Sequence, residues 1–81
     1  GRDSEEFDRE RVVARAVAPS EIGGQTLEEA AVRRKHGVAV GKVRGADGEW
    51  RAAGASSVVS AGDLLIVIGP VDRTERFAAL S

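Results

Sequence analysis

Four consecutive basic side chains are the polar residues of this sequence best suited to binding a ligand. The run is Arg33-Arg34-Lys35-His36, and Gly37 follows it. One interpretation is a solvated helix end, because the helix dipole favours cations there. The other is an anion site at the mouth of a cleft, where Arg33 or Lys35 meets phosphate oxygens. Both remain open for the run as a whole, although we interpret His36 as a surface residue rather than a pH sensor.

Residues for catalysis or metal binding are scarce. A single histidine and the absence of cysteine leave no ligand set for zinc and no Cys/His nucleophile. Neither GxGxxG nor GxxxxGKS/T occurs, so no nucleotide loop is indicated. Glu28 and Glu29 are adjacent and therefore lie on different faces of a helix, so they form no acid/base pair. We expect a protein that is not an enzyme, with no catalytic residues, no metal and no cofactor.

The size and charge of the chain restrict its partners. A chain of 81 residues forms one small domain, which buries only about 60% of its unfolded surface. Because no disulfide can add stability, we expect a homodimer that covers the remaining apolar surface. The net charge of −1 gives no general attraction to nucleic acid or to anionic membranes. The sequence has no signal-peptide pattern and no apolar run near the roughly 20 residues of a membrane span.

The first half of the chain contains an arm, a strand and a helix. Residues 1–10 are densely charged and predict a flexible arm or linker, and residues 11–81 form the domain. Residues 12–17 are rich in valine and predict a strand. Thr26 and Glu29 have the spacing of a capping box, which starts a helix over residues 26–36. Gly37 then ends that helix.

The second half predicts three strands and a short helix. Residues 38–44 and 49–52 form a hairpin around a turn at 45–48, and a loop of small residues spans 54–60. The uninterrupted apolar run of 64–68 predicts a strand covered on both faces. Asp72 predicts the N-cap of a final helix that carries Phe77 and Leu80 on one face. The result is an α+β fold of order β-α-β-β-β-α, in which two helices cover one mixed or antiparallel sheet.

Three segments of this pattern, taken together, resemble a known family, the RCK_C (TrkA-C) domain. They are Ser20-x-Ile22-Gly23-Gly24-x-Thr26-Leu27-x-Glu29, Val32-Arg33-x-Lys35-x-Gly37-Val38-x-Val40 and Ala61-Gly62-Asp63-Leu64-Leu65-Ile66-Val67-Ile68-Gly69. The resemblance covers about residues 11–80. It implies a dimer that senses ligands for potassium channels, potassium uptake systems or cation/proton antiporters, and several members bind cyclic di-AMP across the dimer interface.

The resemblance also implies a position for the ligand. The family's binding surface corresponds here to Val32, Arg33, Ala39, Val40, Ala53 and Gly54. Potassium-uptake members that bind cyclic di-AMP tend to have an acidic residue in place of Ala31 and an asparagine in place of Ala39. Both alanines remove hydrogen-bonding groups, whereas the apolar walls and the arginine remain.

The expected function is therefore that of a regulatory domain. It would bind cyclic di-AMP at a homodimer interface and act on an integral-membrane cation transporter or antiporter in bacteria, without binding nucleic acid. The resemblance also implies a cytoplasmic location, with peripheral association to the membrane through that transporter. Two alternatives remain open: an RCK_C dimerisation module that takes no ligand, and a DNA-binding regulator of the AbrB type. Binding of a nucleotide would exclude the first alternative, and a salt-sensitive gel shift would support the second.

Overall fold

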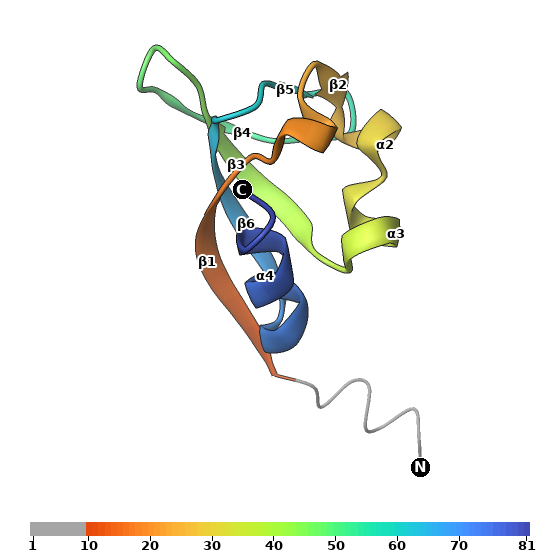
Figure 1. Cartoon of the computed structure of the whole chain (residues 1–81). Helices are drawn as coiled ribbons and strands as arrows, with labels where there is room; N and C mark the ends of the chain where they lie inside the picture. Colours follow the sequence, from red (N-terminus) through yellow and green to blue (C-terminus); the bar gives the residue numbers. More distant parts are fainter. Residues whose placement is uncertain (1–9) are drawn as a thin grey trace.

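A computed structural model describes residues 10–81 (Figure 1). The predicted arm at residues 1–10 therefore lies, except for its last residue, outside the described residues. The strands are β1 (Arg11–Val17), β2 (Gln25–Thr26), β3 (Ala39–Arg44), β4 (Trp50–Ala52), β5 (Val58–Val59) and β6 (Leu64–Pro70). The helices are the 3₁₀ turn η1 (Ser20–Ile22), α2 (Leu27–Ala30), α3 (Val32–His36) and α4 (Val71–Ala78).

The main sheet has the strand order β1-β6-β3-β4, and its neighbouring strands are antiparallel. A register shift between Val40 and Lys42 marks a bulge at Gly41 in β3. The predicted α+β class is confirmed. The predicted antiparallel sheet with its two helices is confirmed as well. Beyond it, the expected loop at 54–60 contains β5, which pairs with β2 as a small two-stranded sheet.

The helices all lie on one face of the main sheet, with α4 against β1 and β6 and α3 against β3 (Figure 1). This corrects the prediction for the run 64–68, which expected cover on both faces. Leu65 and Val67 are completely buried beneath the helices, whereas Ile68, on the opposite face, is 37% exposed. The run is apolar because β6 lies in the middle of the sheet, between β1 and β3, and not because helices cover both of its faces.

The predicted helix over residues 26–36 is interrupted at Ala31. Its start is confirmed: the Glu29 amide donates to Thr26 Oγ1 at 3.0 Å, and the Thr26 amide donates to Glu29 Oε1 at 2.9 Å. Ala31 then takes a left-handed conformation (φ 51°, ψ 42°), which separates α2 from α3. In one straight helix, residues two apart point to nearly opposite sides. The break allows both Ala30 and Val32 to enter the core, where they are 4% and 3% exposed.

The last helix begins differently from the prediction. Its N-cap is Pro70, which makes no side-chain capping bond, so the expected Asp72 cap is wrong. The Thr74 hydroxyl instead donates to the Pro70 carbonyl at 2.8 Å, which satisfies an acceptor at the junction with β6. Phe77 is fully buried and anchors α4 on the sheet.

Candidate functional site

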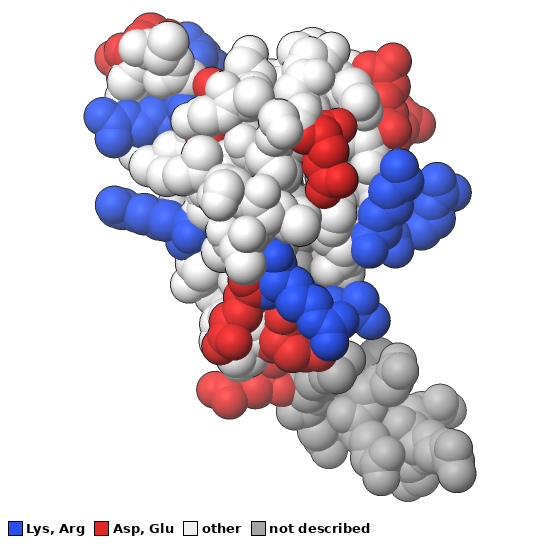
Figure 2. Space-filling view, in the orientation of Figure 1, with Lys and Arg blue, Asp and Glu red and all other residues white. Residues whose placement is uncertain are grey.

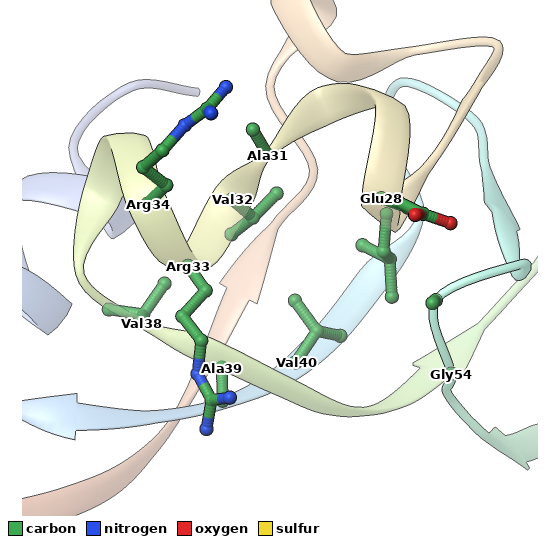
Figure 3. Close-up of a pocket in the computed structure, with 11 residues that line it drawn as sticks. Glu28, Ala31, Val32, Arg33, Arg34, Val38, Ala39, Val40 and Gly54 are labelled. Atoms are coloured by element: carbon green, nitrogen blue, oxygen red, sulfur yellow. The ribbon is translucent and has the colours of Figure 1, made fainter.

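A cavity of about 770 Å³ lies between α2, α3, the start of β3 and the loop after β4 (Figure 3). Its lining residues are Leu27, Glu28, Ala31, Val32, Arg33, Arg34, Val38, Ala39, Val40, Gly54 and Ala55. They come from residues 27–34, from residues 38–40 shortly after them, and from residues 54–55 further along the chain. The cavity is therefore a product of the tertiary fold and not of one local motif.

Backbone hydrogen bonds hold the wall formed by the loop after β4. The Glu28 amide donates to the Ala55 carbonyl at 3.0 Å, and the Leu27 amide donates to the Ser57 carbonyl at 3.0 Å. These two donors belong to the first turn of α2 and have no acceptor within the helix, so the loop satisfies them. The start of α2 and the loop are thereby fixed beside each other on one side of the cavity.

The floor of the cavity is apolar. Val32 and Val38 are 3% and 1% exposed, and Val40 points from β3 toward α2 (Figure 3). Gly54 closes one end, and a side chain there would meet no atom within 4 Å. A flat, apolar ligand surface such as a base can lie on these valines without leaving a buried polar group of the protein unpaired.

Charged groups are confined to the rim. Arg33 extends from α3 past Ala39, whereas Arg34 points away from the cavity (Figure 3). Among residues 10–81 the ion pairs are His36 with Glu21 and Arg51 with Asp47, so neither arginine of the rim belongs to one. Glu28 lies at the far end of the cavity from Arg33. An anion entering beside Arg33 would meet a cation that needs no rearrangement of a protein ion pair.

The structure places five of the six predicted site residues around this one cavity: Val32, Arg33, Ala39, Val40 and Gly54. Ala53 precedes Gly54 in the chain but is not among the lining residues; its amide donates to the Gly41 carbonyl at 3.0 Å. The basic run is divided between two surfaces. Its first two residues line the cavity, and Lys35 and His36 face a second, smaller groove.

Leu27, Glu28, Val38 and Ala55 also line the cavity, and the sequence did not single them out as site residues. Leu27 and Val38 appeared there within the predicted helix and strand and in the motifs of the family resemblance, without a role in binding. The position of Ala55 depends on the hydrogen bonds between its loop and α2, for which the local sequence carries no signal.

In residues 10–81, no three His, Asp or Glu side chains come close enough together to hold a metal ion. No helix in this part of the chain has the length and apolar character needed to cross a bilayer.

Comparison with known proteins gives matches among solved structures. No protein-family model and no curated protein sequence matches the chain. The GsuK RCK domain superposes with a TM-score of 0.77 at 20% identity, over 98% of this chain and 18% of that one. The RCK_C dimer of S. agalactiae BusR in complex with c-di-AMP has a TM-score of 0.73 at 21% identity, over 84% and 86% of the two chains.

A third match is the RCK C domain of the potassium transport protein KtrA in complex with c-di-AMP, with a TM-score of 0.71 at 22% identity over 95% of this chain and 91% of that one. A longer BusR structure, of which the chain covers 34%, is bound to busAB-promoter DNA. The chain therefore has the fold of an RCK domain. Within that class it corresponds in length to the RCK_C domains of BusR and KtrA, and it spans under a fifth of the GsuK chain.

Proposed function

We propose that this chain is a homodimeric regulatory domain of a bacterial cation transporter or cation/proton antiporter, located in the cytoplasm, and that its cavity binds cyclic di-AMP. The observation that carries the proposal is the cavity itself, which combines an apolar floor with an arginine at the rim. The BusR and KtrA domains of the same fold are in complex with c-di-AMP.

The edge of β3 supports a dimer formed at the cavity. β4 pairs only with Lys42, Val43 and Arg44. Ala39 and Val40 thus have a strand neighbour on one side, β6, and none on the other among residues 10–81. A strand edge of this kind is a template for pairing with another chain. Two copies meeting there would bring their cavities together on a two-fold axis, which suits a ligand that is itself two-fold symmetric.

The roles of the residues follow from their chemistry. Val32, Val38 and Val40 would contact the adenine bases, and Arg33 of each copy would meet a phosphate. Ala31 and Ala39 supply no side-chain hydrogen bonds, so backbone groups and Arg33 would provide most of the polar recognition. Ligand binding would favour one arrangement of the dimer over another, and the attached transporter would respond to that difference.

Calorimetric titration of Arg33→Ala with cyclic di-AMP tests this proposal. A hydrogen bond to a charged group contributes about 1.5–3 kcal/mol. Because the substitution removes Arg33 from both copies of the dimer, it should weaken binding by more than about a hundredfold. The matched control is Arg15→Ala, an exposed arginine in β1 that does not line the cavity. It should bind as the wild type does.

Two results would contradict the proposal. One is the absence of heat with folded, dimeric wild-type protein at tens of micromolar, which rejects the ligand but leaves the fold unaffected. The other is that Arg33→Ala and Arg15→Ala bind cyclic di-AMP with equal affinity, which would show that the ligand does not bind in this cavity. The DNA-bound BusR structure gives a specific reason to run a gel shift in parallel. A shift abolished by salt would favour the alternative of a DNA-binding regulator.

A further inference from the structure

The face of the main sheet that no helix covers carries exposed apolar side chains. Ile68 in β6 pairs with Val13 in β1, and Leu64 pairs with Val17, so the members of each pair share this face. Val13, Val17 and Ile68 are 68%, 41% and 37% exposed, and they are three of the six large apolar side chains that are exposed in residues 10–81. Together with the half-buried Leu64 and Ile66 they form an apolar ridge centred on β6. An exposed patch of this kind is typical of an interaction surface.

Long cationic side chains flank this ridge on both sides. Arg15 in β1 and Lys42 in β3 are the two cross-strand partners of Ile66, so they stand on either side of it. Arg11 and Arg44 occupy the same face further along β1 and β3. All four cations are exposed, and neither of the two ion pairs within residues 10–81 includes them. Figure 2 shows Lys and Arg side chains projecting to the left, which is the side of β1 away from the helices in Figure 1.

The electrostatic character of this face has one sign. The four strands of the main sheet contain no Asp and no Glu. Their fifth cation, Arg51, pairs with Val43 and so points to the helix side, where Asp47 neutralises it. The open face therefore attracts a partner that carries carboxylates beside an apolar surface.

The spacing of the two rows of cations matches the width of a helix. Neighbouring strands lie about 4.8 Å apart, so β1 and β3 are about 9.6 Å apart across β6. A helix with its side chains is about 10 Å wide. The seven residues of β6 extend over about 20 Å, which is the length of about 14 helical residues. A helix laid along β6 would place an apolar stripe on the ridge and its two flanks beside the cations.

Two other occupants fit this face less well. A second copy would present the same four cations, and like charges placed opposite each other disfavour association. A bilayer surface would have to admit the apolar side chains about 5–10 Å deep. The arginine and lysine side chains on both sides are longer than the valines and isoleucines between them, so they would meet the headgroups first and hold the ridge away from the acyl chains.

We propose that this face binds a helix of a partner protein, about 14 residues long, whose apolar stripe is flanked on both sides by Asp or Glu. The apolar stripe contacts Ile66, Ile68 and Val13, and the carboxylates meet Arg15 and Lys42. This is recognition of an amphipathic helix by its apolar face, with the charges fixing its orientation. No residue of the ridge or of its four flanking cations lines the cavity or the second groove, so the proposal is independent of the ligand in the cavity.

Fluorescence anisotropy with a synthetic peptide tests the proposal. The probe is a labelled helix of about 14 residues with leucines on one face and glutamates on both flanks, and a second peptide has lysines in place of the glutamates. The wild-type domain should bind the glutamate peptide at about tens of micromolar and should not bind the lysine peptide. Binding should weaken in about 1 M salt, where the Debye length falls to about 3 Å. Trp50, the single tryptophan, pairs with Arg44 on this face, so its emission should change when unlabelled peptide binds.

Charge reversal locates the bound peptide. Arg15→Glu combined with Lys42→Glu should weaken binding of the glutamate peptide by more than about tenfold and should allow the lysine peptide to bind. The matched control, Arg73→Glu combined with Arg76→Glu, reverses two exposed cations of α4. It should bind the glutamate peptide as the wild type does.

A second pair of variants tests the apolar contact with little risk to folding. Val13→Thr keeps the shape of an exposed side chain and adds a hydroxyl, which should weaken binding by about fivefold or more. Val58→Thr is the control, because Val58 is 62% exposed but belongs to the small β2–β5 sheet. Its affinity should equal that of the wild type.

Three results would overturn the proposal. The first is that the glutamate peptide does not bind the folded wild-type domain. The second is that the Arg15/Lys42 reversal binds both peptides as the wild type does, or that the control reversal in α4 weakens binding equally, which would place the peptide elsewhere. The third is sedimentation with vesicles of phosphatidylglycerol and phosphatidylcholine that the Arg15/Lys42 reversal abolishes, in the absence of peptide binding, which would assign the face to a membrane.

Discussion

At the scale of single residues, Ala31 decides the shape of the cavity. It is the one non-glycine residue of the described chain with a positive φ. Its left-handed conformation turns α3 away from the axis of α2, so that Val32 reaches the floor of the cavity and Arg33 its rim. For an L-residue this conformation costs about 1–2 kcal/mol. Burial of both Ala30 and Val32 offsets that cost.

The substitution Ala31→Gly should therefore stabilise the domain. Glycine adopts positive φ without steric strain, although it loses more backbone entropy on folding. The difference should raise the free energy of unfolding by about 0.5–1 kcal/mol in urea titrations. The matched control is Ala30→Gly, which should destabilise because Ala30 is a buried helical residue. A less stable Ala31→Gly would show that the break at Ala31 carries no strain.

At the scale of elements, the sequence correctly predicted the helix ends and turns that depend only on residues close to one another along the chain. The capping box, the turn at 45–48 and Gly37 at the end of α3 (φ 73°) all follow from short-range chemistry. The break at Ala31 could not be predicted in this way, because alanine is a strong helix former. It depends on core positions that only the assembled sheet defines. β5 was missed for the same reason, since Val58 and Val59 form a strand only against β2.

The capping box of α2 should contribute to stability in a pH-dependent way. Hydrogen bonds from the Thr26 backbone amide and from its hydroxyl lower the pKa of Glu29 below its usual 4.5. A lowered pKa means that the contribution is complete above the unfolded value and is lost as pH falls through the folded one. Wild type should therefore be more stable than Glu29→Gln at pH 7, and the difference should vanish as Glu29 is protonated.

Urea unfolding of wild type and Glu29→Gln from neutral to acidic pH measures this difference. Glu28→Gln, which removes a negative charge from the same turn, corrects for the general effect of charge near the start of a helix. A difference that is constant, or that grows toward low pH, would contradict the assigned role of the carboxylate.

At the scale of the whole molecule, α3 joins the cavity to the second, smaller groove. This helix of five residues is bounded by left-handed residues, Ala31 and Gly37. Its first part lines the cavity, and its last two residues line the second groove. The site residues taken from the family resemblance gather at the first of these surfaces with the exception of Ala53. The groove could not be predicted, because it requires α4 to pack beside α3.

The central claim is that one symmetric ligand binds between two copies of this domain. Calorimetric titration of wild-type protein with cyclic di-AMP, on a sample shown to be dimeric by sedimentation, tests it most directly through the stoichiometry. We expect one ligand for every two chains. Saturation at one ligand per chain, or binding to a sample that sediments as a monomer, would contradict it.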